Sequence, residues 1–380
     1  FPPRKSIGSI RIRGLAKYLP RFGWEPTILT ARLPGIPDKK YNIAETPYSG
    51  DISEILKRKL FLKGEKSFQE QIGIPRSIIE RKNSSTSNIV INIKSIFSYP
   101  DEKRFWFKPA VFMGMKILEK EKYDLLLSSS GPFTCHLIAK TLRDRFKIPW
   151  VADLRDLWTQ NHDYRYGAIR KYFERRLEIG SLRPADILVT VSPPFAQNLG
   201  ILHPKKKIEV ITNGFDSEEI FNEKLTKNFT ITYTGKIYKN NQDPEILFKS
   251  LKELIDKDMI DKNKLLVRFF GKKEYWIEEE IKKYQLKENV IQYGIIERED
   301  ALKKQSETQL LLLLNWNCEK EKGVFPGKVF EYLAAGRPIL AIGGAKDSVI
   351  VKLIEKTNTG NYASDRENIK KIVINYYSEF

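Results

Sequence analysis

The stretch Glu319–Gly344, EKEKGVFPGKVFEYLAAGRPILAIGG, decides the fold class of this chain. It follows the unbroken apolar run Leu310–Leu314, which is typical of a strand buried on both faces of a parallel sheet. After a loop with glycine and proline, the good helix formers of Lys328–Ala335 predict a helix that Gly336 ends. A second strand is expected over Pro338–Ile342. The stretch therefore predicts a strand–loop–helix–strand unit of an α/β fold.

The loop of this unit is a candidate anion site. In such a unit the loop lies at the carboxyl edge of the sheet, where the helix N-terminus presents free N–H groups and its positive dipole end. Gly327 permits close approach of a phosphate, and Lys328 adds a positive charge. Glu331, one turn further along, offers a carboxylate to ribose hydroxyls. The alternative is a plain helix of an α/β domain with Glu331 as a surface carboxylate.

This segment resembles the donor-site signature of the retaining glycosyltransferases of family 4 (group 1), which have the GT-B fold of two facing Rossmann-like domains. Two glutamates flank the loop in that family, and Glu331 matches the second. The small residues and proline of Ala334–Pro338 match the turn that follows. The first glutamate falls on Gly323 and is absent, with Glu321 as the candidate substitute.

The chain shows strand–helix alternation twice, with TNGFD (Thr212–Asp216) between the two runs. TNGFD resembles the family's hinge. We therefore expect an N-terminal acceptor-binding domain over 1–216 and a C-terminal donor-binding domain over 217–380, each with a parallel sheet. The expected strands are 124–129, 150–154, 187–191, 209–211, 230–234, 265–270 and 290–293.

The N-terminal region predicts an amphipathic helix over Ser9–Phe22, with Ser9 as its cap, and a strand over Pro26–Ala31. It resembles the family's opening, where a glycine loop meets the donor diphosphate, and Gly8 occupies that place. Arg11 and Arg13 follow in the first turns, and a solvated basic face is the alternative role for them. Because Phe-Pro-Pro follows the first strand in the family, the resemblance implies that one strand is missing before residue 1.

The segment DLRDLW ends the strand expected over 150–154 and contains two carboxylates, Asp153 and Asp156. Residues three apart in a strand face opposite sides, so a metal site is not expected here. The segment resembles the family's strand end where a basic–acidic pair faces the donor sugar, which assigns Arg155 and Asp156 to catalysis. An internal ion pair that fixes the loop is the alternative.

The segment YTGKIYKNNQDP opens the second alternation and resembles the glycine loop in which the family holds the donor phosphates. Gly235 matches that loop, and Lys236 and Lys239 are the available cations. The basic spacing of the family is not reproduced, so both lysines fit surface positions of a turn as well. We expect one of them to reach phosphate, with Lys239 favoured.

Residues 33–107 mix Pro, Ser, Asn and Lys with short apolar runs, which predicts broken helices and mobile loops. Two basic and apolar pieces, Ser53–Lys63 and Lys103–Pro109, suit an interfacial membrane contact. The alternatives are a solvated helix face for the first piece and a core position for Trp106 in the second.

Composition bounds the function classes. The 380 residues exceed what one core usually serves, and no apolar run is long enough to span a bilayer. Two unaccompanied cysteines fit a reducing cytoplasm, and three histidines make a histidine-based metal centre unlikely. The net charge of +18 suits nucleic acid, an anionic membrane surface or phosphorylated substrates, or reflects a lysine-rich composition without a partner.

The resemblance implies a retaining, metal-independent glycosyltransferase that moves a sugar from a nucleotide donor, UDP- or GDP-linked, to an acceptor hydroxyl. A lipid-linked or saccharide acceptor fits polysaccharide or glycolipid biosynthesis in the cytoplasm, on the inner membrane face. No cofactor is expected. The residues proposed to stabilise the leaving diphosphate are Lys236, Lys239, Gly327 and Lys328. Two rivals remain: a sugar-nucleotide epimerase of the same fold, and a basic nucleic-acid-binding protein, which the lack of a stacking platform disfavours.

Overall fold

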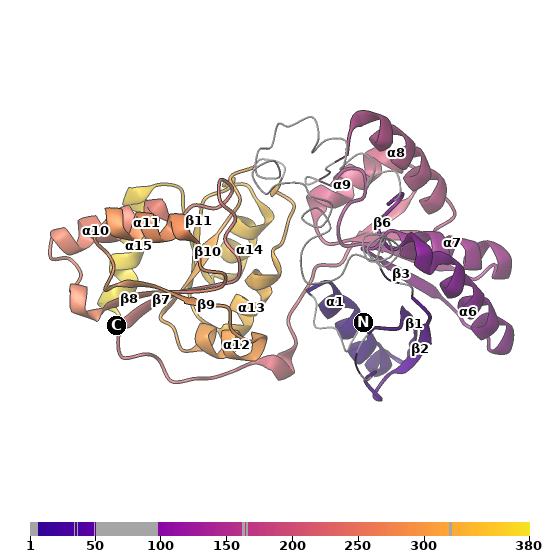
Figure 1. The fold of residues 1–380 in the computed structure, drawn as a ribbon, viewed down its shortest axis with the longest axis horizontal. Coiled ribbons are helices and arrows are strands. Elements are labelled where there is room, and N and C mark those ends of the chain that lie inside the picture. Colours follow the sequence, from indigo (N-terminus) through magenta and orange to yellow (C-terminus); the bar gives the residue numbers. More distant parts are fainter. Residues whose placement is uncertain are drawn as a thin grey trace, which may run out of the picture. The chain divides into compact units, whose positions relative to one another are not determined.

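The computed structural model describes residues 7–33, 35, 37–48, 50, 98–161, 164, 166–318 and 321–380. The chain divides into two compact units, Phe1–Thr212 and Asn213–Phe380, and each contains parallel strands with helices between them (Figure 1). The basic segment Ser53–Lys63 and the opening Phe1–Pro3 lie outside the described residues.

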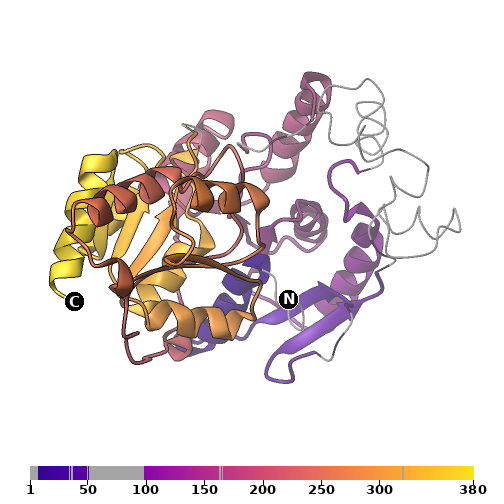
Figure 2. The same cartoon turned by 60° about the vertical axis from the view of Figure 1, so that its left-hand side comes forward.

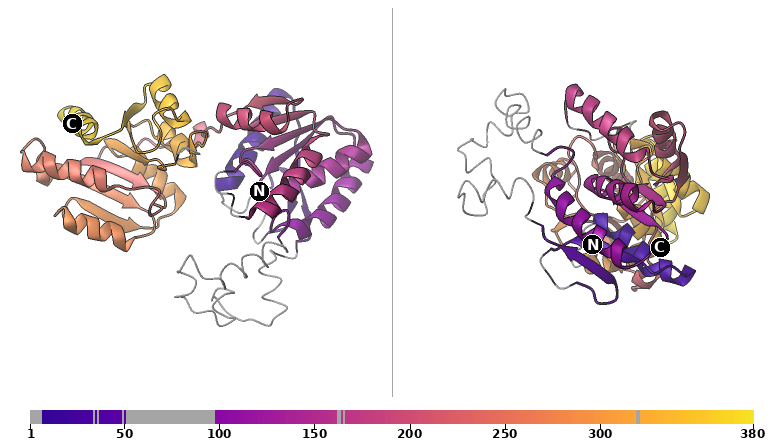
Figure 3. Two further views of the ribbon diagram at one scale, coloured as in Figure 1. Left: turned by 90° about the horizontal axis from the view of Figure 1, so that it is seen from above. Right: turned by 90° about the vertical axis from the view of Figure 1, so that its right-hand side faces the viewer.

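The first unit contains a four-stranded parallel sheet in the order β3-β4-β5-β6 and a separate parallel pair of β1 and β2 (Figure 3). The strands are β1 (Thr27–Ala31), β2 (Asn42–Thr46), β3 (Leu126–Ser130), β4 (Trp150–Leu154), β5 (Ile187–Thr190) and β6 (Lys207–Val210). The helices are α1 (Ile7–Tyr18), α6 (Phe107–Lys120), α7 (Thr134–Phe146), α8 (Ala168–Leu182) and α9 (Pro193–Leu202), with 3-10 turns η1 (Leu19–Phe22) and η2 (Arg104–Trp106).

The second unit contains a six-stranded parallel sheet in the order β12-β11-β10-β7-β8-β9. Its strands are β7 (Phe229–Thr234), β8 (Leu265–Phe270), β9 (Val290–Gly294), β10 (Leu310–Leu314), β11 (Ile339–Ile342) and β12 (Gly360–Ala363). Its helices are α10 (Glu245–Asp256), α11 (Tyr275–Lys283), α12 (Arg298–Ser306), α13 (Gly327–Ala335), α14 (Val349–Thr357) and α15 (Arg366–Ser378), with η3 (Ser217–Glu219) and η4 (Lys262–Lys264).

The core of the second unit explains why β10 is continuously apolar. Leu310, Leu312 and Leu314 pack toward α10, α11 and α15, which lie together in Figure 2. Leu311 and Leu313 point to the other face and pack on α13 and α14. Successive side chains of a strand alternate between faces, so a strand covered by helices on both sides must be apolar throughout. The prediction of a strand buried on both faces is confirmed.

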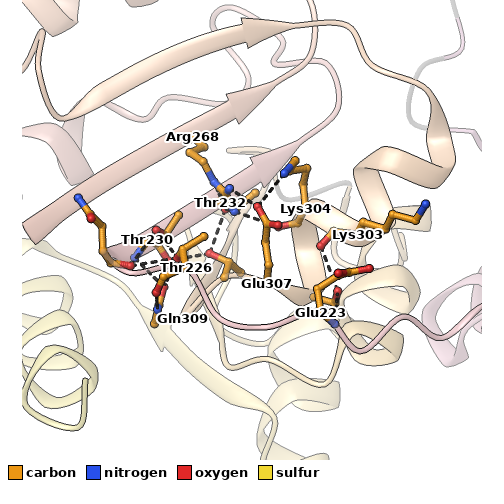
Figure 4. Close-up of polar contacts among 12 residues, drawn as sticks. Glu223, Thr226, Thr230, Thr232, Arg268, Lys303, Lys304, Glu307 and Gln309 are labelled. Carbon is orange, nitrogen blue, oxygen red and sulfur yellow. Dashed lines mark hydrogen bonds and ion pairs between the residues drawn. The ribbon is translucent and has the colours of Figure 1, made fainter.

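A polar network closes the amino edge of this sheet (Figure 4). Arg268 of β8 is buried, forms an ion pair with Glu307 and donates to Thr232 Oγ1 at 3.1 Å. Burial raises the pKa of Glu307, but Arg268 and Lys304 outweigh it, so the pKa lies below its usual value. The Glu307 carboxylate is paired, and each nitrogen of the Arg268 guanidinium donates to a protein acceptor. The role of this network is therefore structural.

Two parts of the N-terminal region differ from expectation. Ser9 lies inside α1, which begins at Ile7, so its prediction as the helix cap is wrong. Strand β2 falls in the region expected to be irregular, and it forms because β1 pairs with it along its whole length. Short strands gain stability from such non-local pairing, which residue pattern alone does not reveal.

Trp106 belongs to the core of the first unit, the alternative considered for it. Its ring is 8% exposed and packs with residues of β1, α6 and α7. Its Nε1 donates to Thr46 Oγ1 at 2.6 Å, which satisfies the buried N–H. Trp106 therefore contributes nothing to an interfacial surface, although the neighbouring Phe105 is exposed.

Candidate functional site

The carboxyl edge of the second unit's sheet is built from glycines at the ends of three adjacent strands. Gly235 N–H donates to Phe270 O at 2.7 Å, and Gly271 N–H donates to Gly294 O at 2.9 Å. Gly235 and Gly294 adopt positive φ, at 106° and 100°. A Cβ on Gly271 would lie 2.2 Å from Gly235 O, so no side chain fits there. The missing side chain of Gly271 lets the Gly235 backbone pack against it, and Gly235 itself is exposed at the edge, where it offers its backbone to an anion.

Lys328 lies against this glycine edge. Its Nζ donates to Tyr233 Oη at 2.5 Å and lies 3.8 Å from the centre of the Tyr233 ring. A Cβ on Gly235 would come within 3.2 Å of Nζ. The fold thus brings together Gly235 and Lys328, which were assigned from separate motifs. Nothing in the sequence indicated that Tyr233, a core residue of β7, contacts Lys328.

Burial gives Lys328 an unusual ionisation. Desolvation lowers the pKa of its ammonium group to about 7, although the Glu331 carboxylate opposes the shift. An anion at the glycine edge would restore the charged form, because an opposite charge favours protonation. We therefore expect the charge of Lys328 to respond to a bound anion.

Helix α13 supplies the N–H groups expected beside Lys328. Gly327 is its first residue, and Pro326 precedes it without a side-chain cap. No acidic residue lies in the first turn, so the positive dipole end is not neutralised within the helix. Gly336 ends the helix with φ of 62°, as predicted for this residue.

Glu331 is held by α12. Its carboxylate forms an ion pair with Arg298 at 3.4 Å, and Gln305 Nε2 donates to it at 3.4 Å. Arg298 also donates to Glu219 Oε2 at 2.8 Å. The Glu331 side chain is 25% exposed, so the carboxylate keeps an accessible side. Sequence reasoning missed Arg298, whose position at the start of α12 gave no sign of this pairing.

Lys236 and Lys239 extend from the loop after Gly235 and are both exposed. Lys236 Nζ lies 4.5 Å above the Tyr238 ring, and Tyr238 packs against Trp316 with ring centres 5.2 Å apart. Within the described chain, Lys239 has no hydrogen bond or ion pair. Tyr233 Oη, which accepts from Lys328 Nζ, donates to the backbone carbonyl of Lys236 at 2.9 Å, so Lys236 reaches Lys328 only through its main chain. A role for the side chain of either lysine stays a prediction.

In the first unit, Arg155 meets Gly8. The guanidinium donates to Gly8 O and, at 3.1 Å, to Gly131 O. A Cβ on Gly8 would lie 2.7 Å from Arg155 Nη2, so a larger residue would displace the arginine. Asp156 pairs with Arg155 at 3.6 Å and is 60% exposed. Two candidate residues from distant motifs, Gly8 and Arg155, are thus in contact. The ion pair between Arg155 and Asp156, considered as the alternative to a role at the sugar, is present, and the catalytic role stays a prediction.

Arg11 corrects the reading of α1 as having a solvated basic face. Its guanidinium donates to both carboxylate oxygens of Asp153, at 3.0 and 2.9 Å, and both side chains are buried. Ser129 Oγ donates to the same carboxylate at 2.6 Å. Asp153 therefore anchors α1 to β4, whereas Asp156 faces solvent.

No group of three or more His, Cys, Asp or Glu in the described ranges is arranged to hold a metal ion. No helix among the described residues has the length and apolar character needed to cross a bilayer.

The model of Glycosyltransferase Family 4 matches residues 8–219. The chain belongs to glycosyltransferase family 4. No curated protein matches the sequence. The chain is a glycosyltransferase of the GT-B type, with two Rossmann-like units, as the resemblance implied.

Solved structures show the same fold at low identity. Sucrose-phosphate synthase from Thermosynechococcus elongatus matches with a TM-score of 0.58 and 14% identity over 97% of this chain and 84% of that chain. WaaG, a glycosyltransferase involved in lipopolysaccharide biosynthesis, matches with a TM-score of 0.51 and 10% identity over 97% of this chain and 86% of that chain. Anabaena Alr3699/HepE in complex with UDP and glucose matches with a TM-score of 0.50 and 14% identity over 93% of this chain and 90% of that chain.

Proposed function

We propose that this glycosyltransferase transfers a sugar from a UDP- or GDP-linked donor to an acceptor hydroxyl with retention of configuration and without a divalent metal. The observation that carries the proposal is Lys328, half-buried against Tyr233 and Gly235 beside the uncapped start of α13. The structure of HepE in complex with UDP and glucose supports a nucleotide donor.

The chemistry follows from charge. The bond between the sugar C1 and the diphosphate oxygen breaks as the acceptor oxygen bonds to C1, and negative charge develops on the diphosphate. Cations and N–H groups already aimed at that charge lower the barrier. Lys328 and the α13 N-terminus are proposed to take this role, and Glu331 is proposed to accept from the ribose. Arg155 and Asp156 are proposed to orient the sugar.

The substrate and location are proposed at a coarser level. A lipid-linked or saccharide acceptor in polysaccharide or glycolipid synthesis accounts for a basic enzyme, since such acceptors lie at anionic membrane surfaces. The proposed location is the cytoplasmic side of the membrane. Of the 66 lysines and arginines, only a few are needed for a donor.

A thermal-shift screen with UDP, GDP, ADP and inorganic diphosphate tests the donor site. We expect stabilisation by one nucleoside diphosphate, loss of that shift in Glu331→Ala, and an unchanged shift in Glu355→Ala, which alters an exposed helical glutamate of α14. A shift retained in Glu331→Ala would contradict the ribose assignment. No shift with any ligand, in a protein that melts cooperatively, would contradict the donor site.

Product analysis separates the rivals. A transferase releases the nucleoside diphosphate at a rate that depends on acceptor, and NMR of the product gives the anomeric configuration. Conversion of the nucleotide sugar without acceptor would favour an epimerase. Loss of activity with EDTA would contradict metal independence.

A further inference from the structure

We propose that the outer face of α8 binds the surface of an anionic lipid bilayer. The α8 face is defined here by Ile169, Tyr172, Phe173, Arg175, Arg176 and Arg183. The inference deepens the proposed membrane association and rests on it, because it names the surface that makes the contact. It does not depend on the donor site of the second unit.

The apolar side chains of this face are unusually exposed. Ile169 is 79% exposed, Tyr172 56% and Phe173 57%. The Tyr172 and Phe173 rings meet edge to face, with centres 5.5 Å apart. Aromatic rings with a polar tip favour the boundary between headgroups and acyl chains, where one end is apolar and the other wet.

Charge is segregated across the same helix. Its two buried glutamates, Glu174 and Glu178, face inward, where Glu174 pairs with Arg170 and Glu178 accepts from Thr159. The exposed side carries Arg175 and Arg176.

Among the residues that the structure describes, no cation of the face forms an ion pair with a carboxylate, although Arg175 lies near enough to Glu178 to act on its carboxylate electrostatically. Arg176 donates to Tyr172 Oη at 2.9 Å, which keeps its charge beside the aromatic pair. In the described part of the chain, Arg175 and Arg183 make no ion pair with a carboxylate. A helix with cations and aromatic groups outward and acids inward is complementary to an anionic, partly apolar surface.

A cavity beside the helix extends this character. Its volume is about 290 Å³, and it is lined by α6, α7 and α8, which lie in the same unit (Figure 1). Phe107, Leu137 and Leu177 supply apolar walls, and Lys140 and Arg176 supply cations. Lys140 is paired with Asp144 at 2.6 Å, which leaves Arg176 as the lining cation without a carboxylate partner in the described chain. An apolar hollow bordered by a cation suits an amphiphile.

Two competing occupants are disfavoured by these side chains. Nucleic acid would use the arginines but gains nothing from the exposed aliphatic Ile169 and Ile179. A second copy of the chain would place equal positive faces against each other, because a two-fold interface repeats the same patch. Both remain outcomes of the experiment.

The test is co-flotation of the purified chain with vesicles of phosphatidylcholine alone or mixed with phosphatidylglycerol. We expect binding only to the anionic vesicles, weakened by salt. Arg175→Gln/Arg176→Gln should lower the partition coefficient by roughly 30-fold, since each cation near such a surface contributes about a factor of five. Tyr172→Ser/Phe173→Ser should weaken binding without changing its salt dependence.

Matched controls lie in the second unit. Lys257→Gln/Lys287→Gln removes two charges, and Tyr275→Ser removes an aromatic ring that is 76% exposed. These variants should float as the parent does. The thermal shift with nucleoside diphosphate should be equal in the parent, the α8 variants and the control variants. Vesicle flotation therefore tests the membrane surface, and the thermal shift tests the donor site independently.

Three results would overturn the inference. They are absence of parent binding to anionic vesicles, equal binding by parent and α8 variants, and equal losses in the α8 and control variants. Loss of affinity for RNA or DNA in the α8 variants, without vesicle binding by the parent, would assign the face to nucleic acid. A concentration-dependent dimer abolished by the same substitutions would assign it to a second copy.

Discussion

Replacing Lys328 with methionine tests the donor site through its pH dependence. Burial sets the pKa of this lysine at about 7 in the free protein, far below its ordinary value. A bound diphosphate restores the ammonium form, so binding takes up a proton whenever Lys328 is neutral beforehand. Affinity for the nucleoside diphosphate should therefore fall as the pH rises through 7.

The size of the effect follows from the protonated fraction. With a pKa of about 7, roughly nine-tenths of the lysine is charged at pH 6 and roughly one-tenth at pH 8. The dissociation constant should rise about tenfold between these two pH values, which is about 1.4 kcal/mol. Lys328→Met keeps the aliphatic stem but has no proton to exchange, so it should bind weakly and without this slope.

Isothermal titration calorimetry in two buffers of different ionisation enthalpy measures both quantities. The parent should take up about half a proton at pH 7, and Lys328→Met should take up less. The titration of the free ligand is common to both experiments, so the difference in proton uptake between parent and variant is the quantity that reports Lys328. An affinity for the parent that does not change between pH 6 and 8, or an equal slope in the variant, would refute the assignment.

Three further predictions concern stability and backbone geometry. Asp153→Asn leaves Arg11 buried beside a neutral partner and should lower the free energy of unfolding in urea by about 3–5 kcal/mol; an effect below 1 kcal/mol would contradict the buried pair. Gly271→Ala should abolish the nucleotide shift, because its Cβ meets the Gly235 carbonyl, whereas Gly14→Ala, which meets nothing, should leave the shift intact. Burial raises the pKa of Glu178 to about 7, above its ordinary 4.5, so the folded state holds the extra proton and the free energy of unfolding should fall as the pH rises from about 4.5 to 7. Glu178→Gln should remove that slope, and an identical slope in both proteins would count against it.

Residue patterns were sufficient for the elements that depend on local sequence. The apolar run of β10 and the helix ended by Gly336 appear at the expected positions. Each depends on side-chain alternation or on a backbone conformation that glycine alone adopts easily. The candidate glycines could also be recognised from the sequence, because the absence of a Cβ follows from the residue type itself.

The partners of the charged residues were not recognisable in this way. Arg11 and Asp153 are 142 positions apart, and nothing local distinguishes their buried pair from two solvated charges. Lys328 is charged in sequence, yet its environment beneath Gly235 and Tyr233 decides its ionisation. Glu331 was read as a ribose ligand from its helix position and from its match to the donor-site signature, whereas its contact with Arg298 depends on how α12 packs.

The sequence by itself determined the α/β class and the two alternating units, because periodicity and glycine placement act over a few residues, and its motifs carried the resemblance to the family to which the chain belongs. Tertiary structure alone decided which charges are buried, which cations remain available and which face of α8 is exposed. The physical reason is that desolvation and pairing depend on neighbours brought close by the fold, and the free energy of a charge depends on those neighbours more than on its own residue type.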